Sequence, residues 1–244
     1  MAPSPKHLRK RRRTTIRLLL AICGIGVTAL AYTASRVVGK RYPSPLTSPV
    51  FFSTPLVIAV VLQSGMHLSD YRPAKDIIVS LLGPATVALA VPLYNHRRTL
   101  LRNLVPASIG LCLGSLSTLV IALVVAGLFD LPQIVRASVS IKSITAPVAI
   151  ELAPMVNGDS TLVAAFVIAT GIIGAMLGPW LMDKAGIHAP LARGVALGTI
   201  SHGQGTAQAV IEGEVQGAAA GIAMVLAAIL VSFVAPILVP ILLR

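Results

Sequence analysis

The stretch that decides the fold is residues 215–243, which read VQGAAAGIAMVLAAILVSFVAPILVPILL. This stretch contains no charged side chain. A helix rises about 1.5 Å per residue, so about 20 apolar residues cross the roughly 30 Å hydrocarbon core of a bilayer. The stretch therefore predicts a membrane-spanning helix.

Similar charge-free stretches recur in the preceding sequence, and one further apolar piece contains two charges. The stretches are Leu18–Ser35, Tyr42–Ser69, Ile77–His96, Asn103–Phe129, Ser160–Met182 and Gly194–Ile211, and the further piece is Val139–Pro154, with Lys142 and Glu151 inside it. A β-barrel would show short segments of alternating polarity instead of long apolar blocks. The sequence therefore predicts an all-α polytopic membrane protein with discontinuous or re-entrant helices and an internal repeat.

The composition agrees with this fold class. Hydrophobic residues make up 55% of the chain and charged residues 11%, and the mean hydropathy is +0.86. A soluble domain carries about a quarter charged residues, so most of this surface should face a medium other than water. The two cysteines, Cys23 and Cys112, lie inside apolar stretches and are expected to pack as small hydrophobic side chains.

The net charge is +12, and many of the basic residues lie in an N-terminal tail, residues 1–15, that we expect to be disordered. A basic run directly before a first span holds the N-terminus in the cytoplasm and lies against anionic headgroups. Nucleic-acid binding is the alternative, but no stacking aromatic side chains accompany the basic residues. We therefore predict a multi-pass inner-membrane protein with a cytoplasmic tail, one transmembrane domain over residues 16–244, and no nucleic-acid partner.

The first apolar segment, residues 16–34, also has features of a signal peptide or of an organellar transit peptide. The segment is long for the core of a signal peptide, and Arg36, Lys40 and Arg41 follow it. We therefore favour a first span that is retained in the protein.

The third apolar stretch conflicts with the usual distribution of basic loops. Two complete spans after a cytoplasmic N-terminus would place residues 70–76 inside, and a complete third span would place the arginine-rich loop 97–102 outside. Basic loops are normally cytoplasmic, and Gly83 with Pro84 interrupts a regular helix in the middle of the stretch. We therefore predict a re-entrant or discontinuous element at Ile77–Tyr94.

Two kinds of internal similarity bear on how the helices are arranged. Residues 83–93 (GPATVALAVPL) resemble residues 145–155 (TAPVAIELAPM) in proline placement, as in transporters built from repeats, and chance similarity is the alternative. Glycine pairs four residues apart allow close approach of helix backbones. Such pairs occur at Gly110/Gly114, Gly174/Gly178, Gly194/Gly198 and Gly217/Gly221. We expect them to pack helices within the chain, and a homodimer seam is the alternative use.

A first polar cluster lies in residues 138–151, SVSIKSITAPVAIE. Pro147 lacks an N–H group and disfavours helix at the preceding residue, so the helix should open near Thr145. Backbone groups freed at membrane depth must face protein or water, which predicts a site for a carboxylate near Lys142 and the neighbouring hydroxyl groups. The alternative is that Lys142 and Glu151 mark the two membrane boundaries.

A second polar cluster lies in residues 193–214, RGVALGTISHGQGTAQAVIEGE. Its glycines surround hydroxyl, amide and imidazole side chains, which indicates an unwound crossing point and not a lipid-facing helix. Histidine titrates near neutral pH, so His202 is a candidate proton carrier. A loop on the membrane surface is the alternative interpretation.

Catalytic and cofactor motifs are missing from the sequence. No G-x-S-x-G, P-loop or HExxH pattern occurs, and no second His or Cys lies at ligand spacing from His202. The adjacent Ser201 and His202 do not make a nucleophile–base pair by sequence alone. We therefore expect no enzyme activity, no cofactor and no metal, with an intramembrane hydrolase as the alternative.

The same residues carry a family resemblance. LLGPATVALAVPLY (81–94), KSITAPVAIELA (142–153), FVIATGIIGAMLGP (166–179), ARGVALGTISHGQGTAQA (192–209) and GEVQGAAAGIAMVLAAILVSFVAP (213–236) resemble LrgB/CidB membrane proteins, including the C-terminal half of the plastid glycolate/glycerate translocator. The resemblance implies either transport of small monocarboxylates such as glycolate, glycerate or pyruvate, or antiholin-like regulation of murein hydrolase export and cell lysis. The chain departs from the family in its arginine-rich start and at Gln204 and Gln208, where an apolar and a basic residue are expected.

The resemblance and the polar clusters together favour a secondary carrier for a small monocarboxylate. The residues expected to bind it are Lys142, Ser143, Thr145, Pro147, Thr199, Ser201, His202 and Thr206, and those expected to couple a proton are His202 and Glu151. Helix breaks are expected at Gly83, Pro84, Gly198, Gly203 and Gly205. An antiholin-like regulator acting with an LrgA-type or holin-like partner is the alternative, and a passive pore is a third class.

Overall fold

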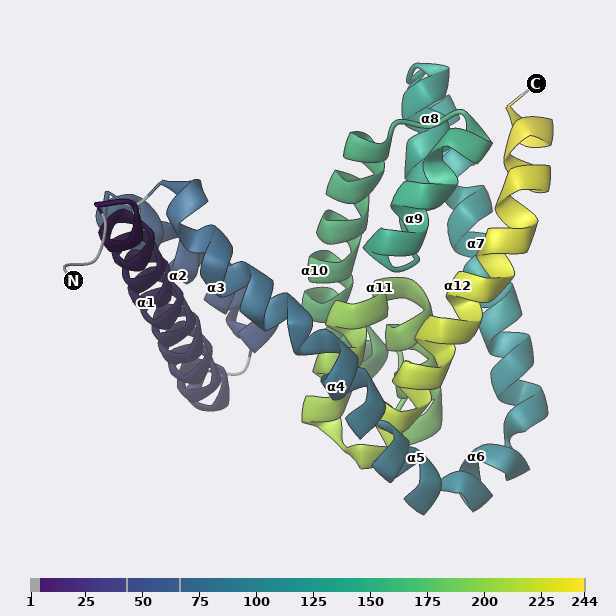
Figure 1. Ribbon diagram of the computed structural model, residues 1–244. Coiled ribbons are helices and arrows are strands. Elements are labelled where there is room, and N and C mark those ends of the chain that lie inside the picture. Colours follow the sequence, from purple (N-terminus) through teal and green to yellow (C-terminus); the bar gives the residue numbers. More distant parts are fainter. Residues whose placement is uncertain (1–4, 43, 66, 244) are drawn as a thin grey trace. The chain divides into compact units, whose positions relative to one another are not determined.

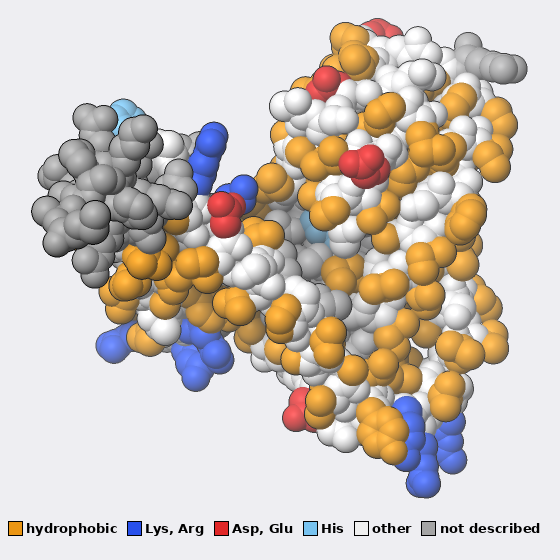
Figure 2. All heavy atoms as spheres, viewed as in Figure 1, with side chains coloured by type: hydrophobic (Ala, Val, Ile, Leu, Met, Phe, Trp, Pro, Cys, Tyr) orange, Lys and Arg blue, Asp and Glu red, His pale blue; other side chains and the backbone are white. Residues whose placement is uncertain are grey.

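The computed structural model describes residues 5–42, 44–65 and 67–243, and the regular elements of these residues are all helices (Figure 1). The chain forms two compact units, Met1–Ala88 and Leu89–Arg244. Five segments among the described residues are long and apolar enough to cross a membrane: Leu18–Arg41, Ser69–Asn95, Leu104–Leu128, Ser160–Lys184 and Glu214–Leu242. Apolar side chains cover much of the visible surface, as expected where helices face lipid (Figure 2). The protein is therefore an all-α polytopic membrane protein.

The first unit contains α1 (Pro5–Arg41), η1 (Pro45–Thr47), α2 (Pro49–Gln63), α3 (Leu68–Ser80) and α4 (Leu82–Ala88). Helices α1 and α3 are antiparallel. A Cβ on Gly24 would contact the Ala74 side chain, and one turn further along α1 the Thr28 hydroxyl is hydrogen-bonded to the Tyr71 hydroxyl at 2.6 Å. Glycine at position 24 thus allows the two helices to pack closely.

The basic tail differs from the prediction of a disordered segment. Helix α1 begins at Pro5, so the tail is helical from that residue, and residues 1–4 lie outside the described part of the chain. The helix continues without interruption into the first apolar stretch. A continuous helix satisfies every backbone group internally as the chain enters lipid, which is the physical reason for this continuity.

The element predicted at Ile77–Tyr94 as re-entrant or discontinuous is a discontinuous helix. Gly83 and Pro84 lie inside α4, and the helix is interrupted at Leu81 and again at Leu89, before α5 (Ala90–Asn95). Taken together, residues 69–95 are long enough for one crossing. The short element is instead α2, whose 15 residues rise only about 22 Å.

The second unit contains three long helices and two helical hairpins. Its elements are α5, α6 (Arg97–Arg102), α7 (Leu104–Leu128), α8 (Gln133–Ser140), α9 (Ala146–Leu152), η2 (Ala153–Val156), α10 (Ser160–Lys184), α11 (Pro190–Glu212) and α12 (Glu214–Leu242). The long helices are α7, α10 and α12. A hairpin follows α7 and another follows α10, so the order of a long helix and then a hairpin occurs twice.

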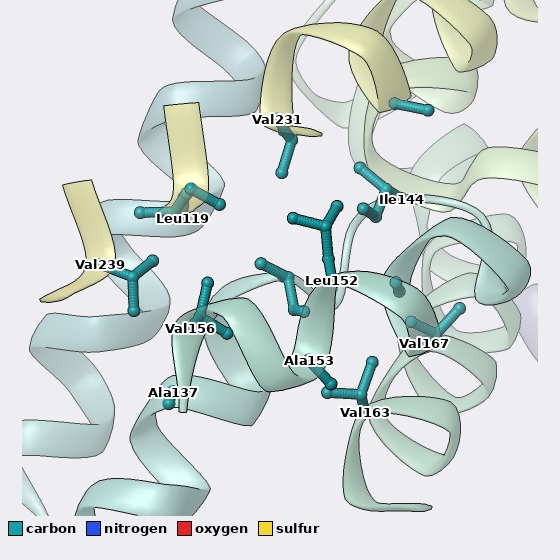
Figure 3. Close-up of a cluster of buried hydrophobic side chains, with 14 of the residues drawn as sticks. Leu119, Ala137, Ile144, Leu152, Ala153, Val156, Val163, Val167, Val231 and Val239 are labelled. Atoms are coloured by element: carbon teal, nitrogen blue, oxygen red, sulfur yellow. The ribbon is translucent and has the colours of Figure 1, made fainter. Parts of the chain in front are cut away.

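The first hairpin, residues 133–156, consists of α8, an open turn, α9 and η2. Its two arms return to the same end, because the Ser138 hydroxyl accepts a hydrogen bond from the Asp159 N–H at 2.9 Å. Apolar side chains of the hairpin pack against the three long helices in one cluster (Figure 3). Ile144 near the turn and Leu152 on α9 belong to this cluster and are almost fully buried. Apolar packing therefore holds the first hairpin.

The second hairpin, residues 190–212, is α11 folded back on itself. Arg193 and Glu212 are 19 residues apart and form an ion pair with an N···O distance of 2.7 Å, whereas a straight helix would separate them by about 28 Å. The chain reverses at His202, whose φ of 38° and ψ of −122° are not helical. A Cβ on Gly205 would overlap the Leu197 carbonyl, so the two arms are in close contact. The predicted span Gly194–Ile211 is therefore a hairpin and not a crossing helix.

The two hairpins occupy opposite halves of the long helices. The second hairpin contacts α7 at Gly114 and α12 as far as Met224. The cluster around the first hairpin begins about one turn further along each of these helices, at Leu119 and Ala228. Helix α10 runs in the opposite direction, so its earlier residues contact the first hairpin. The apolar cluster of the first hairpin ends on this helix at Val167. The level at which the hairpins meet, here called the junction, lies near the middle of all three long helices.

The two segments of similar sequence do not occupy equivalent positions in the fold. Residues 83–93 form α4 and α5, whereas residues 145–155 form the second arm of the first hairpin. The elements that correspond in arrangement are α7 with the first hairpin and α10 with the second hairpin. Because α7 and α10 run in opposite directions, this is an inverted arrangement of two similar units.

Candidate functional site

The turn of the first hairpin brings four of the predicted binding residues to the junction. Residues 141–144 are not helical, and α9 begins at Ala146 directly after Thr145, whose backbone is extended. The Lys142 ammonium donates a hydrogen bond to the Ser143 hydroxyl at 3.3 Å. Ser143 is buried, Lys142 and Thr145 are partly buried, and Pro147 is exposed in the first turn of α9. Pro147 fits there because the first helical turn needs no N–H donor.

The turn of the second hairpin is built around the buried His202, which is 4% exposed. Its Nε2 donates a hydrogen bond to the Val167 carbonyl of α10 at 3.1 Å, because a carbonyl oxygen only accepts. The Thr206 hydroxyl donates to the His202 carbonyl at 2.8 Å and approaches the Met224 sulfur at 3.8 Å. A positive φ at a residue with a side chain costs about 1–3 kcal/mol and persists only where the surroundings fix it.

The predicted helix breaks lie beside the actual break and not at it. Gly198 and Gly205 are helical, and Gly203 is helical and exposed directly after the reversal at His202. A Cβ on Gly198 would overlap the backbone of Ala220 on α12. Gly198 and Gly205 therefore allow close helix packing, whereas a Cβ on Gly203 would meet no atom within 4 Å.

Helix α10 presents a row of glycines to the second hairpin. A Cβ on Gly171 would overlap the Gln204 side chain, and a Cβ on Gly174 would overlap the Ser201 hydroxyl. Gly178 is similarly close to Leu197. By contrast, a Cβ on Gly110 of α7 would meet no atom within 4 Å. Gly174 and Gly178 thus pack helices within the chain, whereas Gly110 faces open space.

Two buried hydroxyl groups at the junction make no hydrogen bond to the described part of the chain. They are Ser115 on α7, which is 2% exposed, and Thr199 on α11, which is 3% exposed. They lie on adjacent helices, because a Cβ on Gly114 would be 3.4 Å from the Thr199 methyl group. Leaving a buried hydroxyl unpaired costs about 1–3 kcal/mol, so each of the two hydroxyls would gain from a polar partner.

A cavity of about 640 Å³ leads to Thr199 between α7 and the first arm of the second hairpin. Thr99 and Asn103 lie at one end of this cavity, near the start of α7, and Gly110 and Gly114 line its inner part. The absence of side chains on these glycines leaves space beside α7. Apart from these polar groups, the walls are mostly apolar.

An arginine clamp closes the open end of the second hairpin. The Arg193 guanidinium donates two hydrogen bonds to the Glu212 carboxylate, at 2.7 and 3.0 Å, and one to Asp183 of α10 at 2.6 Å. It also donates to the Ile187 carbonyl at 3.1 Å. The hydrogen bonds to Glu212 above all, and also the one to Asp183, raise the pKa of Arg193 above its ordinary value, although partial burial opposes this. The clamp therefore ties both arms of the hairpin to α10.

The predicted binding residues fall into two groups by location. Thr199, Ser201, His202 and Thr206 are buried in the second hairpin, and Lys142, Ser143 and Thr145 surround the turn of the first. Glu151 is exposed on α9. No group of three or more His, Cys, Asp or Glu side chains in the described ranges is placed to hold a metal ion.

Sequence reasoning missed the clamp and the Ser115 hydroxyl. Arg193 and Glu212 flank a charge-free stretch almost symmetrically about His202, and this opposite-charge pair was a usable sign of a hairpin. Ser115 has no such sign, because a single serine in an apolar helix usually bonds its own backbone, as Ser140 does with the Ala137 carbonyl.

The fold and this junction define the class of the protein: a multi-pass membrane protein with two opposed helical hairpins. Comparison with known proteins is more specific, because the LrgB-like family matches residues 28–241. The chain therefore belongs to the LrgB-like family.

Similar proteins include three bacterial relatives of almost the same length. The uncharacterized protein YxaC of Bacillus subtilis is 36% identical over 199 residues, which cover 80% of this chain and 85% of YxaC. The uncharacterized protein YwbG of the same organism is 29% identical, covering 79% of this chain and 85% of YwbG. The holin-like protein CidB of Staphylococcus epidermidis is 29% identical, covering 79% of this chain and 84% of CidB. No solved structure matches the chain.

Proposed function

We propose that the protein is a secondary carrier for small monocarboxylates of the glycolate, glycerate or pyruvate kind. The observation that carries this proposal is the junction, where two hairpins entering from opposite ends meet at mid-length of three long helices. Interrupted helices in a membrane protein are tolerated only where their freed backbone groups face protein or a water-filled cavity. Paired interrupted segments near the bilayer midplane are the usual seat of a transported solute.

The side chains at the junction suit a small hydroxy acid. Lys142 supplies a positive charge for the carboxylate. Within the described part of the chain, its ammonium group makes one hydrogen bond, the weak one to Ser143. Thr199 supplies a buried hydroxyl without a partner in the described chain, and Ser201 lies two residues further along the same arm. The cavity that ends at Thr199 provides the path from the α7 end of the unit. His202 is the better candidate for proton coupling, since Glu151 is exposed away from the buried tip.

Uptake by purified protein in liposomes tests the carrier proposal. We expect saturable uptake of radiolabelled glycolate, at least about tenfold lower with Lys142→Met or His202→Gly, because each variant removes a contact made inside the membrane. His188→Gly and Lys184→Met are matched controls, since both residues are exposed outside the junction. Flux that does not saturate would indicate a passive pore, and the absence of uptake for every small acid tried would reject the carrier.

A second candidate function is regulation within a holin-like system, and the names of the staphylococcal relatives favour it over a specific glycolate carrier. Under this proposal the protein controls murein hydrolase export together with an LrgA-type partner. Val105, Ile109 and Leu113 on α7 are exposed apolar side chains, so α7 is the helix we would expect to contact that partner or a second copy of the chain. Altered lysis on deletion, restored equally by wild type and by Lys142→Met, would favour the regulator over the carrier.

We further propose an inner-membrane location with a cytoplasmic N-terminus. Helix α1 crosses outward, α2 is too short for a full crossing, and the segment 69–95 crosses inward. This path puts Arg97, Arg98 and Arg102 inside, in agreement with the positive-inside rule and without a re-entrant third segment. Alkaline phosphatase fused after Arg102 should be inactive in cells, and an active fusion at that site would contradict the proposal.

A further inference from the structure

A second cavity lies on the side of the unit formed by α7 and α12. Its volume is about 280 Å³. Leu104 and Leu111 of α7 form one wall, and Ala219, Ala223 and Leu226 of α12 form the other. The lining residues on α7 span about 10 Å along the helix, so the cavity is an elongated groove. Its floor is buried, as Ala219 and Ala223 are each 2% exposed, whereas Leu104 and Leu226 at its rim are 54% and 40% exposed.

One end of this groove is basic. Arg97 is the single charged residue in its lining, and Arg98 and Arg102 lie on the same short helix, α6. Lys and Arg side chains gather at the end of the unit formed by α5 and α6 (Figure 2). No Asp or Glu of the described chain lies within ion-pair distance of these arginines. The nearby Glu214 interacts with His96, at 3.3 Å. This end therefore carries uncompensated positive charge.

The Arg97 side chain is held in place at the groove mouth. Its Nη1 donates a hydrogen bond to the Tyr94 carbonyl at 2.8 Å, and the guanidinium lies 4.1 Å from the centre of the Tyr94 ring. Tyrosine side chains favour the headgroup level of a bilayer, where one end of the ring is apolar and the other is wet. The guanidinium is thus held beside a side chain of the type that favours the headgroup level.

We propose that this groove binds an anionic phospholipid, with one acyl chain between α7 and α12 and the phosphate against Arg97. An apolar groove whose one charged group is a cation complements this amphipathic anion and no other component of a simple bilayer. Basic pockets beside membrane helices bind anionic headgroups by this charge complementarity. The groove adjoins the cavity that leads to Thr199, with which it shares Ala107, Leu191 and Val195, and the proposal does not depend on whether the protein carries a solute.

Native mass spectrometry of the full-length protein tests the proposal with two probe lipids of equal chain length, dioleoyl phosphatidylglycerol and dioleoyl phosphatidylcholine. We expect retained phosphatidylglycerol to exceed phosphatidylcholine, and Arg97→Gln to reduce that preference about fivefold, the effect of one basic residue near a charged headgroup. Arg97→Lys should keep most of the preference, and Arg72→Gln, which changes an exposed arginine of α3, should leave it unaltered.

A variant that fills the groove distinguishes binding of the acyl chain from electrostatic attraction of the headgroup alone. Ala223→Leu adds volume to the groove floor and leaves Arg97 in place, so it should reduce retention of phosphatidylglycerol. Free glycerol phosphate should not displace the lipid, because it lacks the acyl chain. Equal retention of both lipids, displacement by glycerol phosphate, or a lipid-free dimer that contacts through α7 and α12 would each overturn the proposal.

Discussion

The two hairpins reach the same junction by different means. The first is surrounded by an apolar cluster, and its turn extends over residues 141–145 without a strained residue. The second packs through glycines against α10 and α12, reverses at the single strained residue His202, and is clamped at its open end by Arg193. Apolar packing tolerates modest side-chain changes, whereas close backbone approach does not. We conclude that the second hairpin tolerates fewer substitutions than the first.

The largest effect should follow a substitution at Gly198. Its Cβ would overlap the backbone of Ala220, so Gly198→Ala should separate the second hairpin from α12 and destabilise the protein by about 3 kcal/mol. Gly110→Ala is the matched control, because a Cβ there meets no atom within 4 Å. Thermal unfolding in detergent measures both variants. Equal unfolding temperatures for the two would show that close packing does not distinguish the second hairpin.

A smaller loss of stability should follow removal of the clamp. Arg193→Gln leaves Glu212, whose side chain is 13% exposed, without its ion-pair partner, at a cost of about 2 kcal/mol, which is below the cost for a fully buried pair. The double variant Arg193→Gln/Glu212→Gln should recover part of the loss, because it removes the unpaired charge as well, and Glu212→Gln alone completes the double-mutant cycle. Purely additive losses in this cycle would mean that the two side chains do not act together.

Two replacements of His202 should distinguish the effect of its strained backbone on stability from the role of its imidazole in uptake. His202→Gly gives up one hydrogen bond, about 1 kcal/mol, and the packing of a buried ring, but it releases backbone strain of about 1–3 kcal/mol, which offsets part of that loss. His202→Ala keeps the strain and should unfold at a lower temperature than His202→Gly. Both should lose glycolate uptake. A His202→Gly protein with wild-type uptake would remove the imidazole from the proposed mechanism.

The smallest structural effect should come from the tip of the first hairpin. Lys142 is partly buried and makes one long hydrogen bond, so Lys142→Met should leave thermal unfolding unchanged while uptake falls. The comparison with His202→Ala is informative, because the open turn of the first hairpin needs no particular residue to reverse the chain. A drop in unfolding temperature as large as that of Arg193→Gln would show that Lys142 supports the fold.

Much of the fold could be predicted from charge-free length alone. Residues 104–128, 160–184 and 214–242 are helices as the apolar blocks indicate, because lipid leaves the backbone no other partner. The reversal of α11 could not be predicted from length, since its stretch is as long as a span. The exact position of the reversal depends on tertiary contacts, in which Gly198 and Gly205 are needed for packing and His202 takes the strained backbone.

Many polar residues of the candidate site could be predicted from the sequence, but not all of the residues that belong to the site. Polar groups in an apolar stretch pointed to the tips of both hairpins, because such groups are costly in lipid. The positions of Ser115 and of the Arg193 clamp depend on which faces of the helices pack against one another. In uniformly apolar helices, the sequence pattern does not show which face is buried. Glu151 was included for its charge, and its exposure on α9 follows from the direction in which that short helix leaves the turn.

We infer that the two hairpins enter from opposite faces of the membrane. Single cysteines at Gln133, where the first hairpin begins, and at His188, just before the second, test this in a chain whose Cys23 and Cys112 are replaced by alanine. Both positions are exposed. We predict that a membrane-impermeant maleimide labels position 133 only from outside and position 188 only from inside. Labelling of both positions from the same side would contradict the opposed hairpins and, with them, the junction.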